Sequence, residues 1–136
     1  MTTDPTNIRF MNPSTLSTPP GFTHVVEITH GRTIFIAGQV AFDQSGKIVG
    51  SQDFRIQTQQ VFENLKAALA AVGTDFTHVV KLNIYVVDMS QLPILREVRN
   101  SYINTINPPA STLVEVRRLA NEEFLIEIEA VAHIPE

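Results

Sequence analysis

The chain has 136 residues, 43% of them hydrophobic and 18% charged, a composition typical of one globular domain with its own core. Its net charge of −4 argues against a broad nucleic-acid-binding surface, and the absence of cysteine excludes disulfides, thiol catalysis and thiolate metal sites. Met1–Pro5 lacks the features of a secretory signal and no apolar run approaches the ~20 residues that span a bilayer, so we expect a cytoplasmic protein without membrane contact.

Residues 1–136 are expected to form a single domain, with residues 1–20 as an extended N-terminal arm. The arm contains four prolines and has at most a short edge strand around Ile8–Phe10. Val25–Ile28 is a predicted strand. Thr33–Val40 follows as a mostly apolar strand, expected to be buried on both faces for much of its length. Gly38 within it indicates a β-bulge or a close approach of another segment.

Residues 54–72 show the clearest helical pattern. Apolar side chains recur at the spacing of one helix face, at Phe54, Val61, Leu65, Ala68, Leu69 and Val72. Asp53 is suited to cap the start of this helix, and Gly73 is suited to end it. The alternation in Val79–Val87 then predicts a strand.

A second helix is predicted to begin after Asp88–Ser90, with Pro93 in its first turn. Its expected apolar face consists of Leu92, Leu95, either Val98 or Arg99, Tyr102, Ile103 and Ile106. Asn107–Pro109 ends the helix, because proline lacks the backbone N–H that a helix interior needs.

Residues 108–116 and 124–130 predict two adjacent β-strands. In the second strand, Glu127 and Glu129 point to the face opposite the apolar side chains, about 7 Å apart. Two explanations remain open at this point. The glutamates either form an acid–base pair or make salt bridges to nearby arginines or to a neighbouring subunit.

Two helices can cover only one face of the resulting sheet. On the uncovered face, Leu113, Leu125 and Val131 are expected to alternate with glutamates. A face of this half-apolar kind on a small domain predicts a homo-oligomer.

Several segments, in order and spacing, resemble the RidA/YjgF family, also called the L-PSP endoribonuclease-like family. They are Ile34–Gln39, Gln59–Gly73, Val80–Asp88, Pro109–Val116 with Leu119, and Ile126–Ala132. The resemblance implies an α+β, chorismate-mutase-like fold, with a mixed β-sheet and two helices packed on one face. It also implies a homotrimer with a central barrel and three clefts between subunits.

The activity implied by the resemblance is the hydrolysis of reactive enamines and imines, which makes the chain a possible deaminase of the hydrolase class. No cofactor and no metal are expected. The expected partners are further copies of the chain and a small-molecule substrate or metabolite.

The family's functional residues correspond to named positions in this chain. Glu127 falls on the family glutamate that positions or activates water, which implies a catalytic role. Gly38 and Gln39 fall on a Gly-Gln pair, with Ala37 in place of the usual serine. Phe22 falls on a tyrosine, so the ring is kept and the hydroxyl is lost. The resemblance implies that these four residues bind substrate.

Ser111 falls on the family arginine that holds the substrate carboxylate. A guanidinium makes two charge-assisted hydrogen bonds, each worth about 1.5–3 kcal/mol, whereas serine offers one neutral hydroxyl. Affinity for a 2-imino acid should then fall by roughly two orders of magnitude or more. Arg117 and Arg118 lie about 20 Å along the strand and do not replace it within one chain.

Two other functions remain open. The changes at Phe22 and Ser111 favour a non-catalytic trimer that binds a metabolite. The family's names suggest an endoribonuclease or translation inhibitor, but the acidic net charge and the absence of a basic stripe or paired histidines argue against a nucleic-acid substrate. The four histidines also lack metal-ligand spacing.

Overall fold

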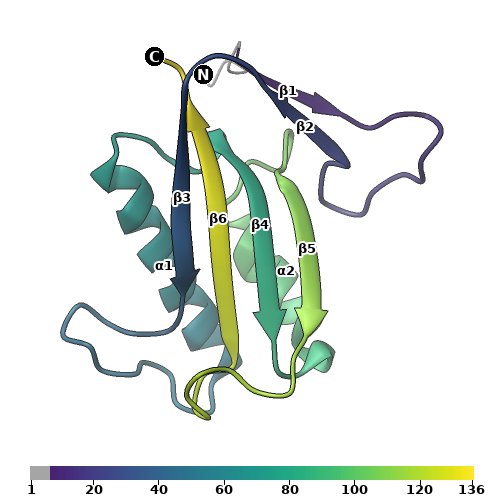
Figure 1. Ribbon diagram of the computed structural model, residues 1–136. Coiled ribbons are helices and arrows are strands. Elements are labelled where there is room, and N and C mark those ends of the chain that lie inside the picture. The colour runs from purple at the N-terminus through teal and green to yellow at the C-terminus, as the bar shows by residue number, and fades with distance from the viewer. Residues whose placement is uncertain (1–6) are drawn as a thin grey trace.

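The structure is a computed structural model and describes residues 7–136, so the start of the predicted arm lies outside the described residues. The elements in this range are β1 (Ile8–Met11), β2 (Val25–Ile28), β3 (Arg32–Gln39), α1 (Phe54–Ala71), the 3-10 helix η1 (Phe76–His78), β4 (Val79–Val86), the 3-10 helix η2 (Met89–Gln91), α2 (Leu92–Asn100), β5 (Ala110–Glu115) and β6 (Ile126–Ile134). Figure 1 shows both α-helices behind one face of a four-stranded sheet. The predicted α+β architecture, a mixed sheet with two helices on one face, is confirmed.

The order of strands in the main sheet is β3-β6-β4-β5. β6 is antiparallel to both of its neighbours, and β4 is parallel to β5. The prediction that the last two strands are adjacent is therefore wrong, because β4 lies between them. A parallel pair needs a crossover connection, and α2 provides it by returning the chain to the outer side of β4.

The arm and β2 form a separate two-stranded antiparallel sheet at one end of the molecule, visible beyond the tops of β4 and β5 in Figure 1. The short strand expected around Ile8–Phe10 is confirmed. The expectation that residues 33–40 are buried on both faces is wrong. β3 is an edge strand of the main sheet, and Phe35 on its outward face is 80% exposed.

Period-two alternation places the core on the helix side of the sheet. Leu82 and Ile84 of β4 and Ile126 and Ile128 of β6 are buried against α1. The α1 side chains packed against them are Val61, Phe62, Leu65 and Leu69, each with no exposed surface. Leu113 and Leu125 also pack against this core, which corrects their expected place on the open face.

The predicted ends of the first helix are confirmed, as is the predicted start of the second, with Pro93 in its first turn, but the predicted end of the second helix is wrong. The Asp53 side chain accepts a hydrogen bond from the Ile56 N–H, and Gly73 follows the helix with φ +80°. The second helix ends at Asn100, because the Asn104 side chain accepts hydrogen bonds from two following N–H groups and turns the chain. Ile106, expected on the apolar face, is 86% exposed.

Gln57 on α1 holds the loop between β5 and β6. Its side chain is fully buried, donates to the carbonyl oxygens of Gly50 and Glu123, and accepts from the Leu125 N–H at 2.8 Å. This loop carries the chain past the end of β4 to the start of β6. The position of the Glu127 strand therefore depends on a buried amide.

We expect Gln57→Ala to lower the free energy of unfolding by about 3 kcal/mol, because three backbone groups lose their hydrogen bonds to the buried Gln57 amide. Urea unfolding measures the effect. Gln59→Ala is the matched control, since Gln59 is an exposed glutamine on the same helix and should change stability by less than about 0.5 kcal/mol. Similar losses in both variants would contradict the role of Gln57.

Candidate functional site

The Glu127 carboxylate lies on the open face of the sheet, against Gly38 of β3. The pairing of β3 with β6 shifts register between Ile36 and Gln39, which confirms the predicted bulge. Any β-carbon at position 38 would overlap the Glu127 carboxyl group, which explains the glycine. Within residues 7–136, Glu127 accepts no hydrogen bond, so its oxygens are available to water or a ligand.

Glu129, two residues along the same face, is bonded differently. The Tyr85 hydroxyl donates to Glu129 Oε1 at 2.7 Å. This hydrogen bond, more than burial or the charges of Glu129 and Glu127, raises the pKa of Tyr85 above its usual value. The structure thus gives Glu129 a partner on β4 rather than the arginine salt bridge considered from the sequence. Arg118 pairs instead with Glu122 at 3.1 Å.

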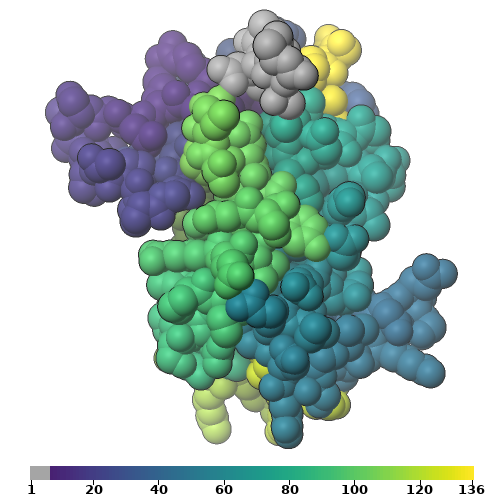
Figure 2. All heavy atoms as spheres, turned by 180° about the vertical axis from the view of Figure 1, so that it is seen from behind, coloured from purple at the N-terminus to yellow at the C-terminus, as the bar shows by residue number. Residues whose placement is uncertain are grey.

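Ser111 and Phe22 meet in a small pocket on the helix side of the sheet. The pocket has a volume of about 150 Å³ and is lined by Pro20, Phe22, Ile84, Leu92, Leu95, Arg96, Arg99, Ser111 and Leu113. It lies between β5, α2 and the arm, and Figure 2 shows the arm from behind, in purple beside the green of α2 and the segment after it. We call it the Ser111 pocket.

Buried Thr23 fixes the arm over this pocket. Its hydroxyl donates to the Pro108 carbonyl oxygen, and its N–H donates to the Pro109 carbonyl oxygen at 3.2 Å. The prolines cannot donate, so their carbonyl oxygens serve as the attachment points just before β5. This contact places Phe22 beside Ser111.

Within one chain, the predicted site residues lie in three separate places. Ser111 pairs with buried Leu82, whereas Glu127 pairs with Tyr85 on the open face, so the two side chains point to opposite faces of the sheet. Gly38 lies against Glu127, and Ala37 lies in the same bulge of β3. The Gln39 backbone pairs with Ile128, and its side chain lies in a third place.

The Gln39 side chain donates to the Ala37 carbonyl oxygen at 3.1 Å. It lines a hollow of about 680 Å³ between the end of β3 and α1, with Gln60 and Asn64 among its neighbours. The Gln39 backbone pairs with Ile128, next to Glu127, but its side chain lines a different hollow from the Ser111 pocket.

Two arginines in the Ser111 pocket were missed as site residues. Arg96 and Arg99 project from α2 toward Ser111 and Phe22. The available signal was the place of Arg99 on the apolar face of the predicted helix, where a charged residue calls for an explanation. Burial, and to a smaller extent the charge of Arg96, lowers the pKa of Arg99 below its usual value.

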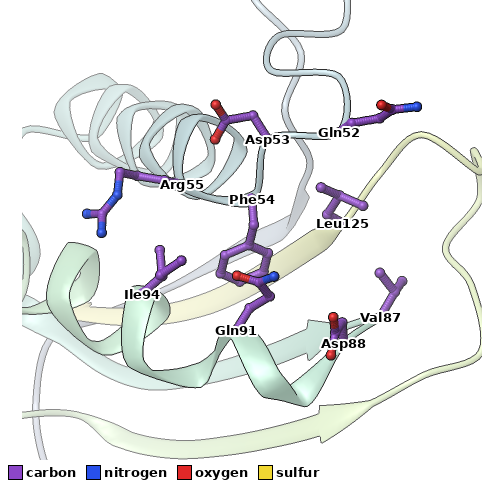
Figure 3. Close-up of a pocket in the computed structure, with 9 residues that line it drawn as sticks. All are labelled: Gln52, Asp53, Phe54, Arg55, Val87, Asp88, Gln91, Ile94 and Leu125. Atoms are coloured by element: carbon purple, nitrogen blue, oxygen red, sulfur yellow. The ribbon is translucent and has the colours of Figure 1, made fainter.

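A larger hollow of about 650 Å³ lies at the other end of α2, between Phe54, Gln91 and Leu125 (Figure 3). Its charged residues already have structural partners. Asp53 caps α1, and Arg55 binds Glu97 at 2.9 Å. Asp88 accepts from the Ser90 hydroxyl and N–H, which lowers its pKa. Because Asp53, Arg55 and Asp88 are all engaged in these bonds, we do not assign the candidate catalytic site to this hollow.

The described residues contain no group of three or more metal-ligating side chains. Neither α-helix in residues 7–136 is long and apolar enough to cross a membrane.

Comparisons with known proteins identify the family of this chain. The family model described as Endoribonuclease L-PSP matches residues 15–134. A RutC family protein from Pyrococcus horikoshii is 42% identical over 107 residues, which are 78% of this chain and 82% of that protein. The human 2-iminobutanoate/2-iminopropanoate deaminase is 35% identical over 101 residues, 74% of this chain and 72% of that protein.

The fold has a close structural match. The crystal structure of a conserved Rid-family protein of unknown function from Yersinia pestis superposes with a TM-score of 0.85 and 41% identity, covering 94% of this chain and 99% of that chain. The chain belongs to the endoribonuclease L-PSP family, the RidA/YjgF family named in the sequence analysis.

Tyr85 provides a test of the open-face geometry. In a Tyr102→Phe background it is the only tyrosine, so an ultraviolet absorbance titration reports it alone. We expect ionisation above the usual pKa of about 10, and a shift back toward that value in Glu129→Gln, which removes the carboxylate charge. Because the folded chain binds this proton more tightly than the unfolded chain, the stability it contributes is lost as pH rises through the folded-state pKa. An unchanged midpoint in Glu129→Gln would contradict the contact.

Proposed function

We propose that the chain is a RidA-type hydrolase that converts reactive imines and enamines into carbonyl compounds and ammonia. The observation that supports this most directly is the Glu127 carboxylate, which lies on the open face over Gly38 without a hydrogen-bond donor from residues 7–136. A carboxylate in this state can accept a proton from a water molecule as the oxygen attacks the C=N carbon. The C–N bond then breaks, and the nitrogen leaves as ammonia. The activity in the name of the human relative is of this class.

The active unit in this proposal is a homotrimer with its clefts between subunits. Ser111 and Glu127 occupy opposite faces of their own sheet, so one small substrate can contact both only if they come from different subunits. The open face also carries apolar surface. Phe35 is 80% exposed and Val114 is 39% exposed, and association of sheets would bury both.

Phe35→Glu should convert the trimer to monomers, because a charge would be buried in an apolar contact between sheets. Size-exclusion chromatography with light scattering measures the mass, which should fall from three times 15.1 kDa to one chain. Ile106→Glu is the matched control, since Ile106 is 86% exposed but lies after α2 and outside the sheet. A trimeric Phe35→Glu protein would contradict the proposed interface.

Glu127→Gln should lower kcat for imine hydrolysis by about 100-fold or more, because general acid–base catalysis contributes at least that factor. Ammonia release from 2-imino acids generated in situ measures the rate. Glu129→Gln is the matched control, with the same change on the same strand face, and should retain activity because Glu129 serves Tyr85. Equal rates in Glu127→Gln and the unaltered chain would remove Glu127 from the mechanism.

Mixed trimers separate an intersubunit cleft from a site within one chain. Ser111→Asp and Glu127→Gln subunits are each expected to be inactive alone. Random assembly of equal amounts should restore about a quarter of the clefts, because each cleft takes one half from each of two neighbours. If mixing restores nothing although mixed trimers form, the two halves do not meet between subunits.

A non-catalytic trimer that binds a metabolite is the second candidate. Ser111 and Phe22 support it, because these two positions carry neither the guanidinium nor the phenol hydroxyl that the family pattern has there. Calorimetric binding of 2-keto acids without any turnover of the corresponding imines would favour this candidate over hydrolysis.

Cleavage of RNA has less support. Three of the four histidines are engaged in local contacts: His24 lies 2.7 Å from the Ser17 carbonyl oxygen, His78 lies 2.7 Å from the Thr74 hydroxyl, and buried His133 lies 2.9 Å from the Thr33 hydroxyl. No salt-dependent RNA binding is expected from a chain of net charge −4.

A further inference from the structure

The Ser111 pocket contains several hydrogen-bond donors without acceptors. Arg99 Nε donates to Asn100 Oδ1 at 3.2 Å, which leaves its two terminal nitrogens without an acceptor in residues 7–136. The Arg96 guanidinium and the Ser111 hydroxyl also have no hydrogen-bond partner within that range. All three groups line the same small volume.

The two guanidinium groups are also without a counter-ion. The salt bridges among the described residues use Arg9, Arg55 and Arg118, and none involves Arg96 or Arg99. Arg99 is half-buried, and Gly21 passes so close that a β-carbon there would lie 2.8 Å from Arg99 Nη2. A partly buried cation beside a second cation is unfavourable until an anion joins it.

We propose that Arg99 and Arg96, together with the Ser111 hydroxyl, form the carboxylate-binding subsite of this chain. The terminal nitrogens of Arg99 have the fork geometry that binds both oxygens of a carboxylate. Arg96 adds charge at the pocket's exposed side, and Ser111 donates a third hydrogen bond. The cation comes from α2 rather than from β5.

Pocket size and walls limit the ligand to a small carboxylic acid. A volume of about 150 Å³ corresponds to roughly five water molecules at ~30 Å³ each, which suits a two- to four-carbon acid and excludes a nucleotide. Phe22, Leu95 and Leu113 are apolar, so they favour a short hydrocarbon substituent next to the carboxylate over an anion that is polar on every side.

The arrangement accounts for serine at position 111. A longer cationic side chain there would bring a third positive charge to a pocket that already holds two, and it would occupy the space that the ligand needs. The small serine hydroxyl adds no charge and leaves that space open for the ligand. This subsite rests on the proposed function, because the bound group would be the carboxylate of the 2-imino acid that Glu127 hydrolyses.

Binding of 2-oxobutanoate to the full-length chain, measured by calorimetry, tests the subsite without requiring turnover. Arg99→Gln should weaken binding by roughly tenfold to a hundredfold, the loss expected for a charge-assisted hydrogen bond. Arg96→Gln, which replaces an exposed residue and should fold normally, is expected to weaken binding by a smaller factor. Arg99→Lys should recover part of the affinity, since it keeps the charge and loses the fork.

Arg55→Gln is the control for a general loss of positive charge. Arg55 pairs with Glu97 on the outer side of the helices, so this variant should leave binding unchanged.

Two further probes identify the ligand class. The neutral amide of 2-oxobutanoate should bind much more weakly than the acid, and inorganic phosphate should not bind more tightly than 2-oxobutanoate. Tighter phosphate binding would overturn the assignment to a carboxylate.

The outcomes separate this subsite from the proposed function. Glu129→Gln, which lies outside the proposed machinery, should bind 2-oxobutanoate as the unaltered chain does. Binding that is lost in Arg99→Gln, with no imine turnover by the unaltered chain, would support the subsite and reject the hydrolase. Binding that is unchanged in both Arg99→Gln and Arg96→Gln would overturn the subsite, whatever the rate of turnover.

Discussion

The alternation of side chains across the main sheet is the constraint on which the rest of this structure depends. Buried residues on the inner face of β4 and β6 must face α1 and α2, because no other apolar layer is available in the described chain. Once that face is fixed, Glu127 must point to the open side and Ser111 to the helix side. Packing of the core thus divides the candidate chemistry between two surfaces, and a single chain cannot join them.

Each surface has its own supporting contacts. On the open side, the bulge in β3 removes the side chain at Gly38 and gives the Glu127 carboxylate its place. On the helix side, Thr23 attaches the arm to the prolines before β5 and closes the pocket with Phe22. The two halves therefore form without each other, and oligomerisation is the step that would bring a water-activating carboxylate to an anion-binding pocket.

The proposed anchor also shows how a binding function can move between elements. A carboxylate needs two or three converging hydrogen-bond donors. A guanidinium can supply them from any element of the chain, provided that it reaches the pocket in which the carboxylate binds. Here α2 packs against β5 closely enough for Arg99 to reach the space beside Ser111. The small residue at position 111 of β5 leaves the space that the Arg99 guanidinium from α2 needs to reach a bound carboxylate.

Local sequence determined the elements whose signals are short-range. The apolar face of α1, its Asp53 cap, the Gly38 bulge and the α+β layering follow from periodicity and backbone chemistry, and the family follows from segments such as Pro109–Val116. The early end of α2 was not anticipated, because the Asn104 side chain overrides a continuing apolar pattern. The exposed face of β3 was also missed, since an apolar run does not reveal whether its strand lies at an edge.

Only the tertiary structure decided which residues meet. Strand order cannot be read from alternation, so the insertion of β4 between β5 and β6 and the place of the Gln39 side chain beside α1 required the fold. Arg96 and Arg99 are distant from Ser111 along the chain, and the packing of α2 on β5 brings them together. The sequence by itself determined the types of residue available for chemistry. Their grouping depends on contacts between distant segments, which no local pattern encodes.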